Sequence, residues 1–251
     1  MKMADFEAEG VRLYLGDSLV VLPELDLEAV DAVITDPPYS SGGATQAARN
    51  APPEKKYVRS DQHKVWPTFL GDNMDGRSWA HWCALWAGLC HQHCRDGAYF
   101  LMFSDWRQAP LASDALQMSR FIRRGMIAWD KTEGARPQQG AFRAQCEYIH
   151  WGTKGPLNRA LGPWPGAFRV PVRQADKFHM TGKPTLLMEA LVEAAPLGGL
   201  ILDPFMGSGT TGVAAIRKGR RFVGVELSPV NFAVAVERIS AALAERSADA
   251  S

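Results

Sequence analysis

The feature that most restricts the fold of this 251-residue chain is the alternation of short apolar segments with segments of helical periodicity. Short runs rich in Val, Ile, Leu and Phe predict buried strands, and apolar residues at helical spacing predict helices. The predicted strands cover 11–15, 29–35, 97–103, 121–129, 145–151, 199–202 and 221–225; the predicted helices begin near 78 and cover 109–119, 184–195, 210–218 and 229–243. This alternation predicts an α/β fold: an open, mostly parallel, twisted sheet with helices on both faces. Segment 145–151 is expected to pair antiparallel with 121–129.

Two segments interrupt this pattern. Residues 40–77 and 152–178 are rich in Gly, Pro and charged residues and have no sustained period, which predicts irregular inserts. Ser78 is the expected N-cap of the helix after the first insert, and Pro184 is expected in the first turn of the helix after the second. We therefore expect one domain over residues 1–251 with two inserts.

Asp36-Pro37-Pro38-Tyr39 directly follows the predicted strand 29–35. Proline fixes its own backbone and restricts the residue before it, so this string predicts a rigid loop with a polar tip. The Asp36 carboxylate and the Pro37 carbonyl are suited to accept the two hydrogens of a base amino group. The Tyr39 ring offers a stacking surface for a base taken out of a duplex. A purely structural proline turn is the alternative for this string taken alone.

A second motif, Asp203–Thr211, lies between a predicted strand and a predicted helix. Gly207, Gly209 and Gly212 fit the pattern G-x-G-x-x-G, and Glu226 ends the next predicted strand. Glycines allow a tight turn and close approach of a ligand, and the acid is suited to bind ribose hydroxyls. This motif alone leaves nicotinamide dinucleotides and S-adenosylmethionine both open. A phosphate-binding P-loop is disfavoured because no lysine follows the second glycine.

Cysteines and histidines crowd into residues 81–94, which raises the question of zinc. However, Trp79, Cys83, Trp86 and Cys90 fall on one helical face, and no C-x-x-C pair occurs. Reduced thiols in an apolar core explain this stretch, so no metal is predicted.

Charge and hydropathy narrow the class of protein. Residues 106–183 hold thirteen Lys/Arg against five Asp/Glu in a chain whose net charge is +1. Such a basic middle fits contact with phosphates, and fits a solvated face equally well. No apolar run is long enough to span a bilayer and the first ten residues are too polar for a signal peptide, so we expect a soluble, cytoplasmic protein.

The two motifs in this order resemble the DNA amino-methyltransferases that modify N6 of adenine or N4 of cytosine. The chain is similar to their beta group, in which a DPPY motif precedes an FxGxG motif. Leu15–Asp17, His179–Leu187 and Phe222–Glu226 resemble further family segments, and the likeness runs from about residue 11 to 240. It implies a Rossmann-like fold with circularly permuted motif order, with S-adenosyl-L-methionine as cofactor.

The resemblance also implies roles for single residues. Asp36 and Pro37 would hold the target amino group, Pro38 would shape the loop and Tyr39 would stack on the base. The implied cofactor residues are Asp17 at the adenine amino group, Thr181 and Lys183 at the amino-acid portion, Asp203, Phe205 at the adenine, Gly207, Ser208, Gly209 and Thr210 near the methionine end, and Glu226 at the ribose. Methyl transfer would be direct, with no covalent intermediate.

Asp at the first position of the catalytic motif favours adenine N6 in a short duplex DNA sequence, reached by base flipping; cytosine N4 is the alternative. A nicotinamide-dependent oxidoreductase and a non-catalytic nucleic-acid-binding module are the weaker rivals. We expect 40–77 to be a mobile DNA-contact loop and 152–178 a short target-recognition segment. The candidate DNA-binding residues are Arg49, Lys55, Lys56, Arg59, Arg159, Arg169 and Arg173.

The expected partner is double-stranded DNA, and no membrane is expected. Because the second insert is short, a second subunit in a homodimer stays open as a contributor to target recognition. A cognate restriction nuclease stays open as well. The resemblance places the protein in the cytoplasm of a bacterium or of a phage-infected cell, at the nucleoid when it acts.

Overall fold

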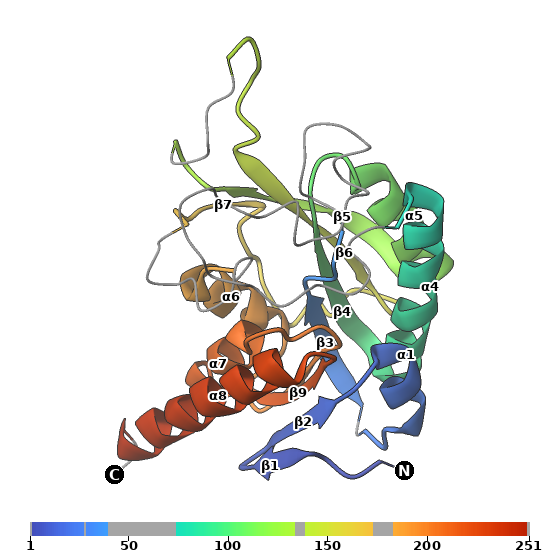
Figure 1. Ribbon diagram of the computed structural model, residues 1–251. Coiled ribbons are helices and arrows are strands. Elements are labelled where there is room, and N and C mark those ends of the chain that lie inside the picture. Colours follow the sequence, from blue (N-terminus) through green and yellow to red (C-terminus); the bar gives the residue numbers. More distant parts are fainter. Residues whose placement is uncertain (1, 28, 40–73, 134–138, 173–182, 250–251) are drawn as a thin grey trace.

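The computed structural model describes residues 2–27, 29–39, 74–133, 139–172 and 183–249. In this part of the chain one nine-stranded sheet runs through the molecule in the order β1-β2-β9-β8-β3-β4-β6-β5-β7 (Figure 1). The strands are β1 (Phe6–Ala8), β2 (Val11–Leu15), β3 (Val30–Thr35), β4 (Cys94–Ser104), β5 (Ile122–Asp130), β6 (Cys146–Thr153), β7 (Ala167–Arg169), β8 (Leu200–Asp203) and β9 (Arg221–Glu226). Most of the predicted insert 40–77 lies outside the described residues.

The sheet is mostly parallel. β3 lies at its centre, parallel to β4 on one side and to β8 on the other, and β8, β9 and β2 continue the parallel arrangement. β6 pairs antiparallel with both β4 and β5, which confirms the predicted hairpin, and β1 pairs antiparallel with β2. All the parallel strands therefore present their carboxyl ends at one edge, where ligands bind in such sheets.

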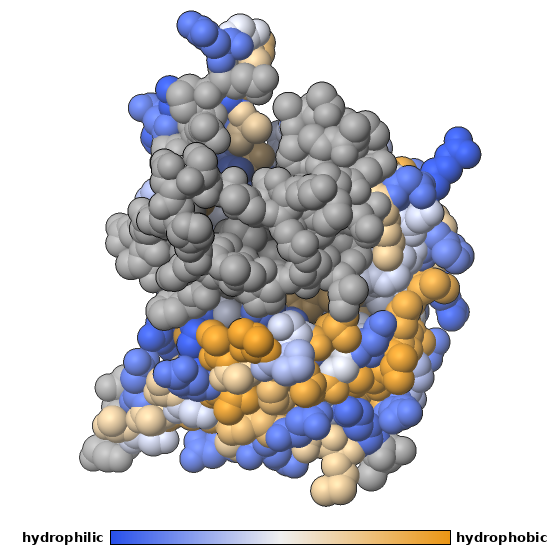
Figure 2. Space-filling model, viewed as in Figure 1, coloured by the Kyte–Doolittle hydropathy of each residue, from blue (hydrophilic) through white to orange (hydrophobic). Residues whose placement is uncertain are grey.

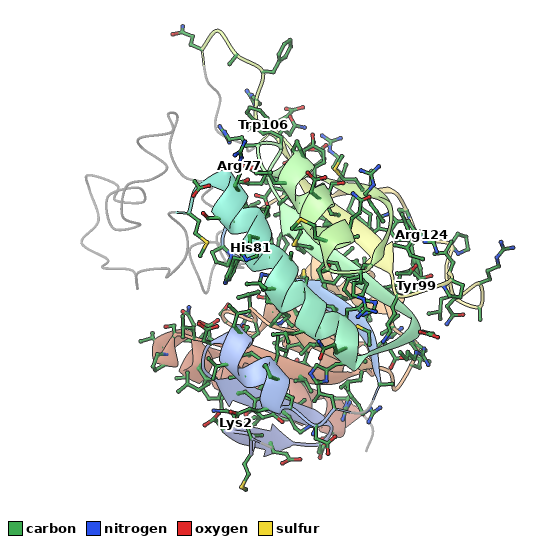
Figure 3. The ribbon with its side chains drawn as sticks, turned by 90° about the vertical axis from the view of Figure 1, so that its right-hand side faces the viewer. Lys2, Arg77, His81, Tyr99, Trp106 and Arg124 are labelled. Carbon is green, nitrogen blue, oxygen red and sulfur yellow. The ribbon has the colours of Figure 1, made fainter. Side chains whose placement is uncertain are left out.

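Helices cover both faces of the sheet, as predicted. They are α1 (Ser18–Val21), α4 (Gly76–His93), α5 (Ala109–Met118), α6 (Thr185–Leu191), α7 (Thr210–Arg217) and α8 (Pro229–Asp249), with 3-10 turns η1 (Leu22–Glu24) and η3 (Val192–Ala194). Apolar residues of α1, α4 and α5 join one core cluster, and those of α6, α7 and α8 join the other. Figure 3 shows α4 and α5 side by side in front of the sheet, with α1 below them.

The central strand explains why both faces are covered. Every residue of β3 is buried; Ala32 and Ile34 contribute to the core under α6–α8, and Val33 to the core under α1, α4 and α5. A strand buried on both faces carries a continuous apolar run rather than an alternating one. This run carries Asp36 to the edge of the sheet.

The predicted core helix is confirmed, but its N-cap is not Ser78. Asp75 caps α4, because its carboxylate accepts hydrogen bonds from the backbone N–H groups of Arg77 and Ser78 at 3.0 and 3.1 Å. Ser78 already belongs to the first turn. The thiols of Cys83, Cys90 and Cys94 are buried, and burial raises the pKa of Cys94 to about 12. They are packed as core residues.

Several element boundaries also differ from the prediction. The segment 152–178 is not wholly irregular, since β6 extends to Thr153 and β7 pairs parallel with β5 inside it. Pro184 precedes α6 as its N-cap, and α6 passes into η3 instead of continuing as one helix. β4 and α8 are longer than predicted, and β1 and α1 were not predicted.

The surface of the described part is mixed in character. Figure 2 shows apolar and hydrophilic patches interspersed on the face that carries α7 and α8. Among the described residues, no helix is both long enough and apolar enough to cross a bilayer.

Candidate active site

The two motifs meet because β3 and β8 are neighbours in the sheet. Thr35, the last residue of β3, donates a hydrogen bond from Oγ1 to Oδ1 of Asp203, the last residue of β8, at 2.8 Å. Asp203 also accepts from Thr211 Oγ1 at 2.6 Å and from the Phe205 N–H at 3.0 Å. Burial raises the pKa of Asp203 to about 7, although these donors oppose the shift. Asp203 therefore joins the Asp36–Tyr39 loop to the glycine loop.

The Asp36–Tyr39 loop is held through its carbonyl groups. The indole Nε1 of Trp79, on α4, donates to the Pro38 carbonyl at 2.6 Å. The side-chain amide of Gln108, just before α5, donates to the Tyr39 carbonyl at 3.4 Å. Proline stiffness and these two bonds together give the loop a defined shape.

Charged side chains gather beside this loop. Lys183 Nζ donates to Asp36 Oδ2 and lies 3.5 Å from Glu147 Oε2. Lys131 Nζ lies 3.1 Å from Glu147 Oε1, and the Tyr39 hydroxyl donates to Glu147 Oε2 at 3.3 Å. We call Asp36, Tyr39, Lys131, Glu147 and Lys183 the charge cluster. It draws on segments that follow β3 and β5, on β6, and on the residues before α6.

Burial and pairing compete in this cluster. Burial disfavours the charged form of Lys183, but the Asp36 and Glu147 carboxylates outweigh it and raise the pKa of Lys183. Burial likewise opposes ionisation of Glu147, but Lys183 and Lys131 outweigh it and lower its pKa. Burial and the nearby Glu147 and Asp36 carboxylates raise the pKa of Tyr39 well above its usual range. At neutral pH these shifts keep Glu147 ionised, Lys183 cationic and the Tyr39 phenol neutral.

The glycine loop adopts backbone conformations that favour glycine. Gly209 precedes α7 with φ of +79°, and a Cβ there would lie 3.1 Å from Ala235 Cβ. Gly207 has φ of +53°, and a Cβ there would meet nothing within 4 Å. Gly212 packs against Phe222 and Ile239, where a side chain would collide. The glycine loop is therefore tightly packed against the core at Gly209 and Gly212, and has free space beside it at Gly207.

Glu226 fixes the other side of this loop. Its carboxylate accepts from the Gly207 N–H at 2.9 Å and from the Ser228 N–H at 2.8 Å, and burial raises its pKa despite these bonds. Its backbone carbonyl accepts from Gly16 N at 2.9 Å, which brings Asp17, the N-cap of α1, to the end of β9. Arg238 donates to the Ser208 carbonyl at 2.6 Å and to Thr210 Oγ1 at 3.1 Å.

These residues fit the predicted cofactor. Gly207 leaves open space at the carboxyl edge, and the Glu226 carboxylate, held by the Gly207 and Ser228 N–H groups, lies beside that space as a hydrogen-bond acceptor suited to a ribose hydroxyl. Phe205 presents a half-buried ring whose far side packs on Trp82 and Trp86, with centroids 5.1 and 5.0 Å away. Such a ring suits contact with a planar base.

The structure brings together most of the predicted site. Asp36 to Tyr39 and Lys183 form one group, and the Asp203–Thr210 loop, Glu226 and Asp17 form the adjacent one. Lys183 contacts Asp36, so its expected role at the cofactor's amino-acid portion stays a prediction. Thr181, Arg49, Lys55, Lys56, Arg59 and Arg173 lie outside the described residues.

The two remaining candidate DNA contacts lie apart from one another. Arg169 ends β7, and its Nε is 3.6 Å from Asp130 Oδ2 at the carboxyl end of β5, on the same edge as Asp36. Arg159 follows Asn158, which contacts Gly97 and Tyr99 near the amino end of β4. Arg159 therefore starts from the opposite edge, and the structure does not bring it together with Asp36.

Several residues of the site were not predicted from the sequence. They are Thr35, Trp79, Gln108, Lys131, Glu147 and Arg238. Glu147 had one usable signal, since it is the one acidic residue in the predicted strand 145–151. The rest carry no local signal, since their roles depend on contacts across the sheet.

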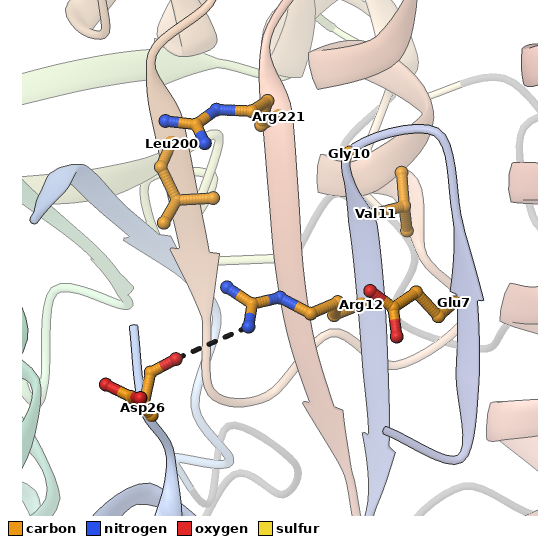
Figure 4. Close-up of a pocket in the computed structure, with 7 residues that line it drawn as sticks. All are labelled: Glu7, Gly10, Val11, Arg12, Asp26, Leu200 and Arg221. Carbon is orange, nitrogen blue, oxygen red and sulfur yellow. Dashed lines mark hydrogen bonds between the residues drawn. The ribbon is translucent and has the colours of Figure 1, made fainter. Parts of the chain in front are cut away.

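A separate pocket of about 350 Å³ lies at the amino ends of β2, β8 and β9 (Figure 4). Its lining includes Glu7, Arg12, Asp26 and Arg221, and Arg12 donates to the Asp26 carbonyl at 3.3 Å. Because it opens at the edge opposite Asp36, it is not part of the candidate active site.

Comparison with known proteins identifies the family. A family model described as DNA methylase, covering N6 and N4 methylases, matches residues 30–164 and 164–237. The type II methyltransferase M2.DpnII of Streptococcus pneumoniae is 27% identical, over 90% of this chain and 88% of its own. The M1.HpyAVI–SAM complex aligns with a TM-score of 0.67 at 21% identity, over 91% of this chain and 98% of that one. The PvuII cytosine-N4-specific DNA methyltransferase aligns with a TM-score of 0.68 at 16% identity, over 94% of this chain and 89% of that one. This chain, with its Asp36 loop beside its glycine loop, belongs to the N6/N4 DNA methylase family.

Proposed function

We propose that this DNA methyltransferase transfers a methyl group from S-adenosylmethionine to N6 of adenine in a short sequence of duplex DNA. The observation that carries the proposal is the junction of the Asp36 loop with the glycine loop through Thr35 and Asp203. Asp at the first position of the catalytic motif supports adenine. Cytosine N4 is the second candidate, because the family includes N4 methylases and the PvuII enzyme is cytosine-N4-specific.

When bound, S-adenosylmethionine supplies an electrophilic methyl group on a sulfonium centre. The Asp36 carboxylate and the Pro37 carbonyl accept the two hydrogens of the base amino group and so turn the nitrogen lone pair toward that methyl. The chain's own part would be to hold the amino nitrogen in line with that methyl group, with the Asp36 carboxylate as the acceptor for the proton that the nitrogen gives up as it gains the methyl. Positioning and electrostatic orientation supply the acceleration.

The remaining residues bind and orient. Glu226 accepts from the ribose hydroxyls, Phe205 contacts the adenine of the cofactor, and the open side of Gly207 admits the methionine end. The target base leaves the duplex and stacks on Tyr39. The Tyr39 side chain is only 8% exposed, so this stacking requires the groups around the ring to move.

Duplex DNA is the proposed partner, and Arg169 is the candidate phosphate contact that starts from the edge of Asp36. A second subunit and a cognate restriction nuclease stay proposals. So does a location in the bacterial cytoplasm or in a phage-infected cell.

The decisive experiment is methylation of unmodified plasmid DNA by the purified protein and S-adenosylmethionine, followed by base-resolved mapping. We expect N6-methyladenine at every copy of one short sequence, with Asp36→Ala as the inactive control. N4-methylcytosine at those sites would replace the adenine assignment. Failure to modify any DNA would overturn the proposal.

A thermal-shift comparison separates the nicotinamide rival. S-adenosylhomocysteine should raise the melting temperature, because a ligand that binds only the folded state stabilises it, and NAD should not. A shift with NAD alone would favour an oxidoreductase.

A further inference from the structure

Glu147 is the point at which the charge cluster converges. It lies near the start of β6, which runs antiparallel to β4, so its side chain reaches the same edge as Asp36. Tyr39, Lys131 and Lys183 come from three other segments, and all three contact its carboxylate, at 3.3, 3.1 and 3.5 Å. One carboxylate thus ties the catalytic loop to the residues before α6 and after β5.

The cluster balances two lysines against two carboxylates in a poorly solvated place. The side chain of Lys183 is 8% exposed and that of Glu147 18% exposed. A buried ammonium group needs a charged partner or hydrogen-bond acceptors, because water does not solvate it. Lys183 has its shortest contact with Asp36, and Glu147 stands next to it as a second acceptor.

Binding of the target amino group changes the hydrogen bonds that Asp36 and Lys183 can make to each other. The target amino group must donate to Asp36, which weakens the hold of Asp36 on Lys183. Lys183 then needs another acceptor within reach, and Glu147 Oε2 already lies 3.5 Å from its Nζ. The same oxygen accepts from the Tyr39 hydroxyl, which fixes the position of the far end of the ring and so limits its tilt.

We propose that Glu147 is a positioning residue for methyl transfer: it orients the Tyr39 ring and takes over the Lys183 ammonium when Asp36 binds the target amino group. The inference rests on the proposed function, since it assigns Asp36 to the amino group. Glu147 itself touches no reacting atom. It acts through Tyr39 and Lys183.

The test compares Glu147→Gln with a matched control, Glu193→Gln. Glu193 lies in η3, and its Oε1 is 3.5 Å from Lys218 Nζ, which is the distance that separates Glu147 Oε2 from Lys183 Nζ. Each substitution removes one carboxylate charge, beside Lys131 and Lys183 for Glu147 and beside Lys218 for Glu193, but only Glu147 belongs to the charge cluster. Single-turnover methyl transfer is measured with plasmid DNA, alongside the Kd for S-adenosylhomocysteine and the melting temperature.

We expect Glu147→Gln to slow methyl transfer by about tenfold to a hundredfold, the range for misplaced catalytic groups, with the S-adenosylhomocysteine Kd within about twofold of wild type. Glu193→Gln should retain the wild-type rate. Glu147→Asp, which restores the charge, should recover part of the loss.

The pH profile separates positioning from simple support of the fold. The ionisable groups facing Lys183 are Asp36, Glu147 and Tyr39, and Phe103 packs on it with its ring centroid 5.0 Å from Nζ. Loss of Glu147 leaves Asp36 as the one carboxylate among these groups, so the rate of Glu147→Gln should begin to fall at a lower alkaline pH than the wild-type rate. A merely structural role would lower the rate by the same factor at every pH.

Tyr39→Phe alone tests the contact between Tyr39 and Glu147 without needing Glu147→Gln to fold, and the double variant tests the coupling of the two residues. It removes the hydroxyl bond and keeps the ring, so its effect should be large in wild type and small in the Glu147→Gln background. Additive effects, or a Glu147→Gln enzyme with the wild-type rate and pH profile, would overturn the inference. Inactive wild-type protein would instead contradict the proposed function.

Discussion

Thr35 Oγ1 donates a 2.8 Å hydrogen bond to Asp203 Oδ1, and this bond joins the residue before Asp36 to the start of the glycine loop. Both side chains are buried, so the bond is shielded from water. Asp203 in turn holds Thr211 in the first turn of α7. The spacing between the Asp36–Tyr39 loop and the predicted cofactor site is therefore set by a short chain of buried hydrogen bonds.

Thr35→Val keeps the shape of the side chain and removes its hydroxyl group. We expect the free energy of unfolding to fall by about 1–3 kcal/mol, because Asp203 loses a buried donor. The loss should be larger at pH 8 than at pH 5, since an ionised carboxylate accepts more strongly. Urea unfolding at both pH values measures it, and Thr35→Ser, which keeps the hydroxyl group, is the control. Equal stability of Thr35→Val and wild type at pH 8 would show that this bond does not stabilise the fold.

The pKa of Asp203 predicts a pH-dependent stability. Burial raises it from the usual 3.8 to about 7, so the folded state favours the protonated acid. The stabilisation that this provides is complete below pH 4 and is lost as the pH rises through 7. A difference of about three pKa units corresponds to about 4 kcal/mol.

Asp203→Asn does not titrate and so isolates this effect. The free energy of unfolding of wild type minus that of the variant should decline between pH 4 and 7 and level off above. Urea titrations across this range measure the difference, and Asp114→Asn, on the exposed side of α5, controls for loss of a charge alone. A difference that stays constant with pH would argue against a raised pKa.

Asp36→Ala should abolish methyl transfer while binding of S-adenosylhomocysteine survives. The carboxylate that orients the amino group is lost, whereas the Glu226 and Gly207 contacts are untouched. Tritium incorporation into DNA and calorimetric titration of the ligand measure the two properties. Normal turnover in this variant would remove Asp36 from the mechanism.

Gly207→Ala tests the cofactor loop, and Gly198→Ala is its matched control. Both glycines have positive φ, +53° and +72°, and at both a Cβ would meet nothing within 4 Å. Each alanine should cost about 1 kcal/mol of stability through backbone strain. Only Gly207 lies in the predicted cofactor site, so only Gly207→Ala should weaken S-adenosylhomocysteine binding, by about tenfold or more. Equal ligand affinity in both variants would place the cofactor elsewhere.

Features that depend on local patterns were predictable from the sequence. The apolar run of β3 and the prolines after it located Asp36 at a strand end, and the glycine spacing located the loop before α7. The strand β7 was not predicted, because three residues are too few to show a period. The sequence predicts Ser78 as the N-cap of α4, although Asp75, inside the irregular insert, offers the same capping chemistry and is the cap in the structure. Local signals of this kind cannot rank two neighbouring caps.

The charge cluster could not be predicted for a different reason. Glu147 matters because antiparallel pairing brings the start of β6 to the edge where β3 ends, and Lys183 approaches from another part of the chain. Arg159 was predicted to contact DNA but does not lie near Asp36, because the turn after β6 lies at the amino end of β4, on the opposite edge of the sheet. Positive charge along the sequence identified a basic region but not the edge to which each side chain belongs.

The central pairing of β3 with β8 also has a consequence for the folding of the chain during its synthesis on the ribosome. Thr35 and Asp203 are 168 residues apart, so Asp36 is synthesised long before the strand that completes its surroundings. Until β8 emerges, one edge of β3 has no partner strand and the predicted cofactor loop that follows β8 has not been made. A nascent or prematurely terminated chain therefore carries the Asp36–Tyr39 tetrapeptide without the glycine loop that follows β8, and we expect such a chain to be inactive.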